Sequence, residues 1–126
     1  MSVETLPTEE DKDSLVRPLE LEGKTYKISN SSFDYSVFVT INNFNGRPFE
    51  IFINSKSPET YPAFTALTRV ISAVFRETAE LEFLAEELKQ VFDPNGGYWK
   101  KGTFIPSIYA ELGIVLGRHL NELEEK

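Results

Sequence analysis

YSVFVTINNFNGRPFEIFI, residues 35–53, contains two runs in which apolar and polar side chains alternate. In the first run, residues 35–42, the apolar side chains on one face of an extended strand are Tyr35, Val37, Val39 and Ile41. The second run continues the alternation at Phe49, Ile51 and Ile53. Asn45 and Gly46 lie between the runs and both tolerate a positive φ angle, so the stretch predicts a β-hairpin.

Each run breaks its alternation once, with an aromatic residue. Phe38 and Phe52 fall on the otherwise polar face of the hairpin, where we expect another surface to cover them. Upstream of the hairpin, residues 23–28 alternate weakly and are compatible with a third short strand.

A first helix is expected after the hairpin. Residues 57–59, Ser-Pro-Glu, supply a cap, a proline and an acid for a first turn, while Pro62 is equally compatible with a start near Tyr61. The apolar residues of this helix cover well over half of its circumference, which predicts a central, largely buried helix: Phe64, Leu67, Val70, Ile71, Val74 and Phe75. The polar remainder is one stripe of Thr65, Arg69, Ser72 and Arg76.

Two more helices are expected. The second covers residues 78–92, with an inner face of Leu81, Leu84, Leu88 and Val91 and an outer face of Glu82, Glu86 and Lys89. It ends at residues 93–97, DPNGG, which form a strong helix breaker. The third begins near Pro106, and one of its faces carries Ile108, Leu112, Val115 and His119. On a neighbouring face, small residues allow another backbone to approach closely: Ala110, Gly113 and Gly117.

These elements predict an α+β fold in which a short antiparallel sheet, made of the hairpin and the candidate third strand, packs against three helices. A chain of 126 residues, of which 40% are hydrophobic, fits one domain that needs no disulfide or structural metal. No run of about 18 apolar residues occurs, and the N-terminus is acidic where a signal peptide would be basic. We therefore expect no membrane association, and the cytoplasm is the simplest location.

The formal charge of −7 is unevenly distributed. Residues 1–22 contain seven acids and two bases and so contribute −5, which leaves −2 for the rest of the chain. Residues 1–18 are polar and acidic and lack apolar periodicity, so we interpret them as a disordered tail and residues 19–126 as a single domain. Because an acidic protein is poorly suited to grip phosphate backbones, nucleic-acid binding is not expected.

The residues that carry chemistry are scarce. The chain has no cysteine, which excludes a thiol nucleophile, a thiyl radical and a thiolate metal site. His119 is its only histidine and is expected to pack in the core. The carboxylates of the second helix have solvent-facing spacing, and residues 95–97 are too short for a phosphate-binding loop. We therefore expect no enzyme activity, no cofactor, no metal and no catalytic residue.

Two further features are typical of binding surfaces. Residues 95–101 combine two glycines with adjacent aromatic and basic side chains in a predicted loop: Tyr98, Trp99, Lys100 and Lys101. The alternative is that Trp99 folds back and caps the core. Arg69 and Arg76 are suited to meet a carboxylate or phosphate, or else form the solvated side of their helix with Arg76 paired to Glu80. The partner-binding hypothesis therefore rests on Phe38, Phe52, Arg69, Arg76, Tyr98, Trp99, Lys100 and Lys101.

Longer stretches of the chain resemble one known family. Residues 47–56, RPFEIFINSK, and residues 66–76, ALTRVISAVFR, are similar to the C-terminal domain of adenosylcobalamin-dependent (class II) ribonucleotide reductases, called the TSCPD domain. The similarity continues through residues 91–99, VFDPNGGYW, and covers residues 23–120. A match of this length is more specific than any short motif.

The resemblance implies an accessory function. In the full-length reductases the radical chemistry and the cobalamin and nucleotide sites lie in a large barrel, where cysteines abstract hydrogen. This chain has no cysteine and so lacks the Thr-Ser-Cys-Pro-Asp motif that gives the family its name. The implied protein is an accessory or regulatory one in deoxyribonucleotide synthesis, and its implied partner is the large subunit of such a reductase. The alternative is a freestanding module that kept the fold and binds another protein, or itself through Phe38 and Phe52.

Overall fold

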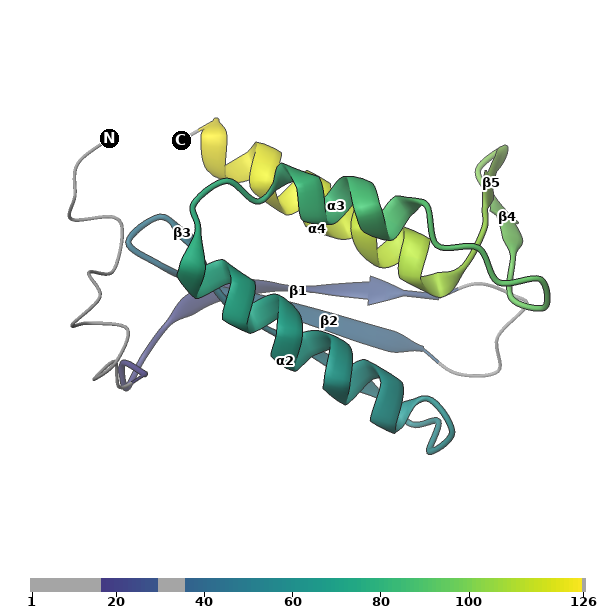
Figure 1. Cartoon of the computed structure of the whole chain (residues 1–126), viewed down its shortest axis with the longest axis horizontal. Coiled ribbons are helices and arrows are strands. Elements are labelled where there is room, and N and C mark those ends of the chain that lie inside the picture. Colours follow the sequence, from purple (N-terminus) through teal and green to yellow (C-terminus); the bar gives the residue numbers. More distant parts are fainter. Residues whose placement is uncertain (1–16, 30–35, 126) are drawn as a thin grey trace.

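The computed structural model describes residues 17–29 and 36–125 and has an α+β fold (Figure 1). In chain order its elements are β1 (Glu22–Ile28), β2 (Val37–Phe44), β3 (Arg47–Ser55), α2 (Tyr61–Glu77), α3 (Glu82–Lys89), β4 (Tyr98–Lys100), β5 (Thr103–Ile105) and α4 (Ile108–Glu124). The expected antiparallel sheet and three helices are confirmed. The second two-stranded sheet, β4–β5, was not expected from the sequence.

β1, β2 and β3 form an antiparallel sheet in that order, which confirms the hairpin and the candidate third strand. The turn of the β2–β3 hairpin has φ angles of 52° at Asn45 and 78° at Gly46, the positive values that a tight hairpin turn requires. The pairing shifts register between Asn42 and Asn43, which marks a β-bulge. Tyr35 and nearly all of the expected tail, residues 1–16, lie outside the described residues.

One face of the sheet carries the core. Its buried side chains pack in a single cluster with residues of all three helices, including Phe75 of α2, Leu81 and Leu88 beside and within α3, and Leu116 of α4. α2 lies along β3, and α3 lies along α4. The sheet residues of this cluster are Tyr26, Ile28, Val37, Val39, Ile41 and Ile51.

The helix bounds differ from those expected. The second helix spans only Glu82–Lys89, because Thr78 is extended (φ −146°, ψ 150°) and the Arg47 guanidinium donates to the carbonyls of Phe75 and Thr78 at 2.8 and 2.7 Å. Val91 therefore lies outside the helix and is exposed, so its expected inner position is wrong. α2 begins at Tyr61, the start that Pro62 allowed.

α4 begins one residue after Ser107, whose hydroxyl accepts a hydrogen bond from the Ala110 amide at 3.0 Å. Gly113 confirms the expected close approach of another backbone. A Cβ atom at Gly113 would lie 2.7 Å from the Ala85 carbonyl oxygen and 2.9 Å from Leu88 Cβ, both in or beside α3. At Gly117 the nearest atom, Ala85 Cβ, would be 3.7 Å away, so the two helices diverge there.

The expectation that α2 is largely buried is wrong. Only four of its side chains are fully buried: Phe64, Thr68, Ile71 and Phe75. Val70 is 62% exposed, and Leu67 and Val74 are only partly buried. The sheet has three strands and α3 pairs with α4, so no described element packs over the outer side of α2.

Candidate functional site

The segment expected to be a loop around Trp99 is a short β-hairpin. Residues 98–100 pair with residues 103–105, and Lys101 and Gly102 form the turn with φ angles of 51° and 79°. Figure 1 shows this hairpin, β4–β5, projecting from the end of the molecule opposite the C-terminal end of α2. The pattern of a strand run, a turn glycine and a second short apolar run was present in the sequence, although each strand has only three residues.

The alternation of the strand separates the predicted binding residues. Tyr98 is 4% exposed, and its hydroxyl donates a hydrogen bond to Glu111 of α4. The Lys100 ammonium forms an ion pair with the other carboxylate oxygen of Glu111. Tyr98 and Lys100 therefore anchor the hairpin to α4.

Trp99 points the other way and is 68% exposed, so it does not cap the core. It stacks edge-on against Phe104, its cross-strand neighbour, with 5.4 Å between the ring centroids. Phe104 is itself 45% exposed, and Lys101 is exposed at the turn. Phe104 was missed by reasoning from the sequence, because its exposure depends on the pairing of β4 with β5.

Phe38 and Phe52 lie on the outer face of the three-stranded sheet, as expected. Phe38 pairs with Asn54 and Phe52 with Thr40, so the two aromatic residues are diagonal neighbours on one face. Both are about half exposed, and none of the described helices covers this face. The cover expected for them is not found among the described residues.

Arg69 and Arg76 share a groove with Phe52 between α2 and β3. The groove has a volume of about 430 Å³, and its outer wall on α2 includes Val70 and Ala73. The Arg76 guanidinium lies 5.7 Å from the centre of the Phe49 ring. No ion pair joins Arg76 to Glu80 in the described part of the chain, and Arg69 is exposed on the solvent side of the helix.

The eight predicted residues thus fall into two groups, one on the β4–β5 hairpin and one on and beside β3. The family model of the TSCPD domain matches residues 8–120, which is most of the chain. The chain belongs to the TSCPD domain family. No curated protein and no solved structure matches it significantly.

In this TSCPD domain the single histidine packs in the core, as expected. The Tyr26 hydroxyl and His119 Nδ1 share a hydrogen bond of 2.7 Å, and His119 Nε2 lies 2.9 Å from the Asn43 side-chain oxygen. Burial raises the pKa of Tyr26, and the Arg118 guanidinium covers its ring at 5.1 Å. These groups join β1, β2 and α4.

Glu50 on β3 is, with Glu111, one of the two buried acids among the described residues. The Arg17 guanidinium donates to both of its carboxylate oxygens at 2.8 and 2.9 Å, and the Asn42 amide donates to one of them at 2.6 Å. The hydrogen bonds from Arg17 hold the pKa of Glu50 below its ordinary value, with smaller contributions from Asn42 and from the charge of Arg76. The charge and the hydrogen-bonding oxygens of Glu50 are therefore paired with Arg17 and Asn42 of the same chain.

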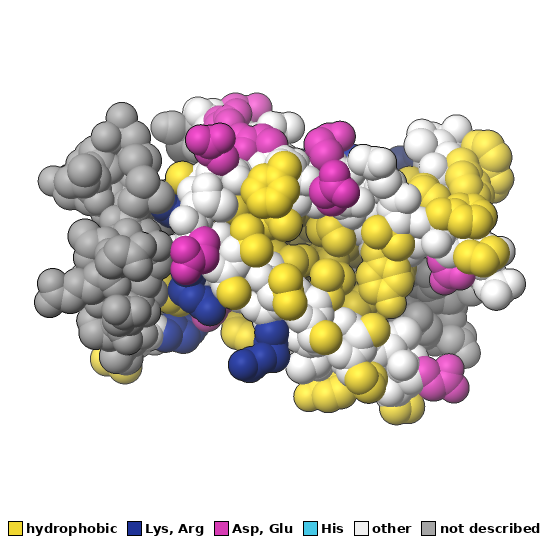
Figure 2. All heavy atoms as spheres, viewed as in Figure 1, with side chains coloured by type: hydrophobic (Ala, Val, Ile, Leu, Met, Phe, Trp, Pro, Cys, Tyr) yellow, Lys and Arg dark blue, Asp and Glu magenta, His cyan; other side chains and the backbone are white. Residues whose placement is uncertain are grey.

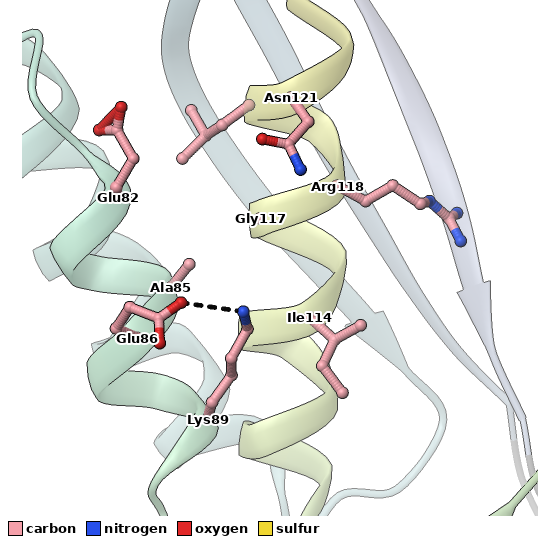
Figure 3. Close-up of a pocket in the computed structure, with 9 residues that line it drawn as sticks. Glu82, Ala85, Glu86, Lys89, Ile114, Gly117, Arg118 and Asn121 are labelled. Atoms are coloured by element: carbon pink, nitrogen blue, oxygen red, sulfur yellow. Dashed lines mark hydrogen bonds and ion pairs between the residues drawn. The ribbon is translucent and has the colours of Figure 1, made fainter. Parts of the chain in front are cut away.

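A second groove, of about 300 Å³, lies between α3 and α4 (Figure 3). Lys89 crosses it and pairs with Glu86 at 3.0 Å, while Arg118 points away toward the sheet. Its charged groups therefore do not converge on a common point. Among residues 17–29 and 36–125, no three potential metal ligands are grouped, and no helix is long and apolar enough to cross a membrane.

Proposed function

We propose that this TSCPD domain is a non-catalytic accessory protein of ribonucleotide reductase, which binds a reductase subunit through its β4–β5 hairpin. Membership of the TSCPD family supports the connection with the reductases. The absence of cysteine means that the chain cannot itself form the thiyl radical that starts ribonucleotide reduction.

The observation that carries the proposal is the exposed Trp99–Phe104 pair on a rigid hairpin. Exposed tryptophan is uncommon on a surface with no partner, and tryptophan is among the residues most enriched in interface hot spots. The hairpin is held from beneath by Tyr98 and Lys100, which both bind Glu111. The aromatic pair is therefore preorganised, which lowers the entropy lost when a partner docks.

The polar groups of the domain also support a binding role. His119 is enclosed between Tyr26 and Asn43, and Glu111 already accepts from two side chains. Catalytic acids and bases instead lie together at a cleft within reach of a substrate.

The test is isothermal titration of the full chain with the purified large subunit of the adenosylcobalamin-dependent reductase from the same organism. We expect a saturable complex that Trp99→Ala weakens by about 30-fold or more, as truncation of a hot-spot aromatic does. Tyr61→Ala removes an equally exposed aromatic (65% against 68%) at the start of α2 and should bind as the wild type does. Failure of the wild type to bind would contradict the proposal and favour the alternative, a module with a different partner.

A further inference from the structure

The outer side of α2 is apolar although it is open to solvent. Ala63, Ala66, Val70 and Ala73 are all exposed, and their spacing of three or four residues places them on one face of the helix. Figure 2 shows hydrophobic side chains gathered along α2 and in the strip between α2 and α3. Contiguous exposed apolar surface is typical of contact surfaces when it is large.

The two borders of this band carry opposite charge. On the face drawn in Figure 2, dark-blue basic side chains lie below the band, with one magenta acidic side chain beside them at its left end, and several magenta ones lie above it, over α3. The basic border contains Arg69 and Arg76, and neither takes part in an ion pair within the described residues. No acidic residue lines the groove beside them.

Ala73 is the small residue that lies between the two arginines along the basic border. On the helix surface its neighbours are Arg69 and Val70, four and three residues before it, and Arg76 and the exposed Glu77, three and four residues after it. All three of Arg69, Ala73 and Arg76 line the groove of about 430 Å³. The Ser72 hydroxyl accepts a hydrogen bond from the Ile51 amide at 3.0 Å, so this edge group of β3 is not available to an added strand.

The acidic border carries a large exposed side chain, Phe83, that could fill the groove beside Ala73. Phe83 of α3 is 52% exposed although it is a large apolar residue. Its neighbours on the surface of α3 are Glu86 and Glu87, at spacings of three and four residues, and Glu80 lies three residues before it in the chain, just ahead of the helix. Glu86 pairs with Lys89, whereas no ion pair of the described residues uses Glu80 or Glu87.

We propose that two copies of this chain form a symmetric dimer in which α2 of each copy packs against α3 of the other. Phe83 of one copy lies over Ala73 of the other, between Arg69 and Arg76, where its ring face meets the guanidinium groups. Glu80 and Glu87 around the ring then face the two arginines. A two-fold arrangement makes this contact twice and buries the apolar band between the charged borders, which is the self-complementarity that a closed dimer needs.

The test is sedimentation velocity of the full chain over a range of concentrations, with two charge-reversed variants. The first variant is Arg69→Glu with Arg76→Glu, and the second is Glu80→Lys with Glu87→Lys. We expect the wild type to be dimeric and each variant alone to dissociate at least about 100 times more readily, because like charges then face each other in both contacts. Mixing the two variants restores opposite charges in both contacts and should restore the dimer.

The matched control is Lys27→Glu with Lys101→Glu, which changes the net charge as much as the first variant does but lies on the outer sheet face and the hairpin turn. It should remain dimeric, and circular dichroism should show all variants folded. A wild type that stays monomeric would overturn the proposal and leave the band to a different protein. A dimer that survives both charge reversals would also overturn it, because another surface, such as the one around Phe38 and Phe52, would then join the copies.

Discussion

At the scale of single residues, Glu111 links the candidate binding hairpin to the body of the domain. Its side chain is nearly buried and accepts from the Tyr98 hydroxyl and the Lys100 ammonium. The Tyr98 hydroxyl is buried with it and donates its hydrogen bond to this carboxylate.

Replacing Glu111 by alanine should therefore destabilise the domain by about 1–3 kcal/mol, the usual result of leaving buried partners unsatisfied. Glu86→Ala is the control, because its pair with Lys89 is exposed and such pairs contribute less than about 1 kcal/mol. The denaturant midpoints of both variants give the comparison. Equal midpoints would mean that Glu111 does not anchor the hairpin.

Arg17 and Glu50 predict a dependence of stability on pH. Because Arg17 lowers the pKa of Glu50 in the folded state below its ordinary value of 4.5, the pair stabilises the fold above that pH. The contribution is lost as the pH falls through the lowered pKa and Glu50 becomes protonated. Arg17→Gln should be less stable than the wild type at pH 7, and this difference should shrink as the pH falls below about 4.5 in urea titrations. A difference that stays constant down to pH 3 would contradict the assignment.

At the scale of elements, the contact of α3 with α4 depends on one glycine. Gly113→Ala would place a methyl group 2.7 Å from the Ala85 carbonyl oxygen, and we expect a loss of about 1–3 kcal/mol from overpacking. Gly117→Ala, one turn further on, has its nearest contact at 3.7 Å, so the better helix propensity of alanine should leave it neutral or stabilised by up to about 1 kcal/mol. Thermal unfolding of the two variants distinguishes the sites, and a stable Gly113→Ala would show that the helices are not so close.

The sequence predicts an element well when neighbouring residues determine it, and poorly when contacts with distant residues do. The β2–β3 hairpin was predicted because Asn45 and Gly46 form its turn and the alternation on both sides is local. The length of α3 was not predicted, because Arg47 from a distant strand donates to the carbonyl of Thr78 and the chain there is extended. The exposure of Val70 was missed for a similar reason, since apolar periodicity shows how wide a face is and not whether another element covers it.

The candidate site was predicted in part. The sequence identified Trp99 as a candidate anchor, but it could not separate Trp99 from Tyr98 and Lys100, because the turn at Lys101 and Gly102 sets which side chains face α4. It also treated Phe52 and the two arginines Arg69 and Arg76 as separate features. They share a groove only because α2 lies along β3.

At the scale of the whole molecule, the two proposed contact surfaces lie on different elements. The β4–β5 hairpin carries the aromatic pair proposed to bind a reductase subunit, and the α2–α3 face carries the charge-bordered band proposed to bind a second copy. Trp99→Ala should therefore leave the dimer unchanged, and the charge reversals on α2 and α3 should leave the Trp99–Phe104 pair intact.

The central claim is that the Trp99 hairpin touches the reductase subunit, and Trp99 is the only tryptophan in the chain. A ¹⁵N-labelled chain therefore gives one indole N–H signal in its nuclear magnetic resonance spectrum. Titration with the unlabelled large subunit should shift or broaden that signal in proportion to the complex formed, with a midpoint that matches the calorimetric affinity. The claim would be contradicted if a complex forms while the indole signal keeps its position and broadens no more than the signals of backbone amides far from the hairpin.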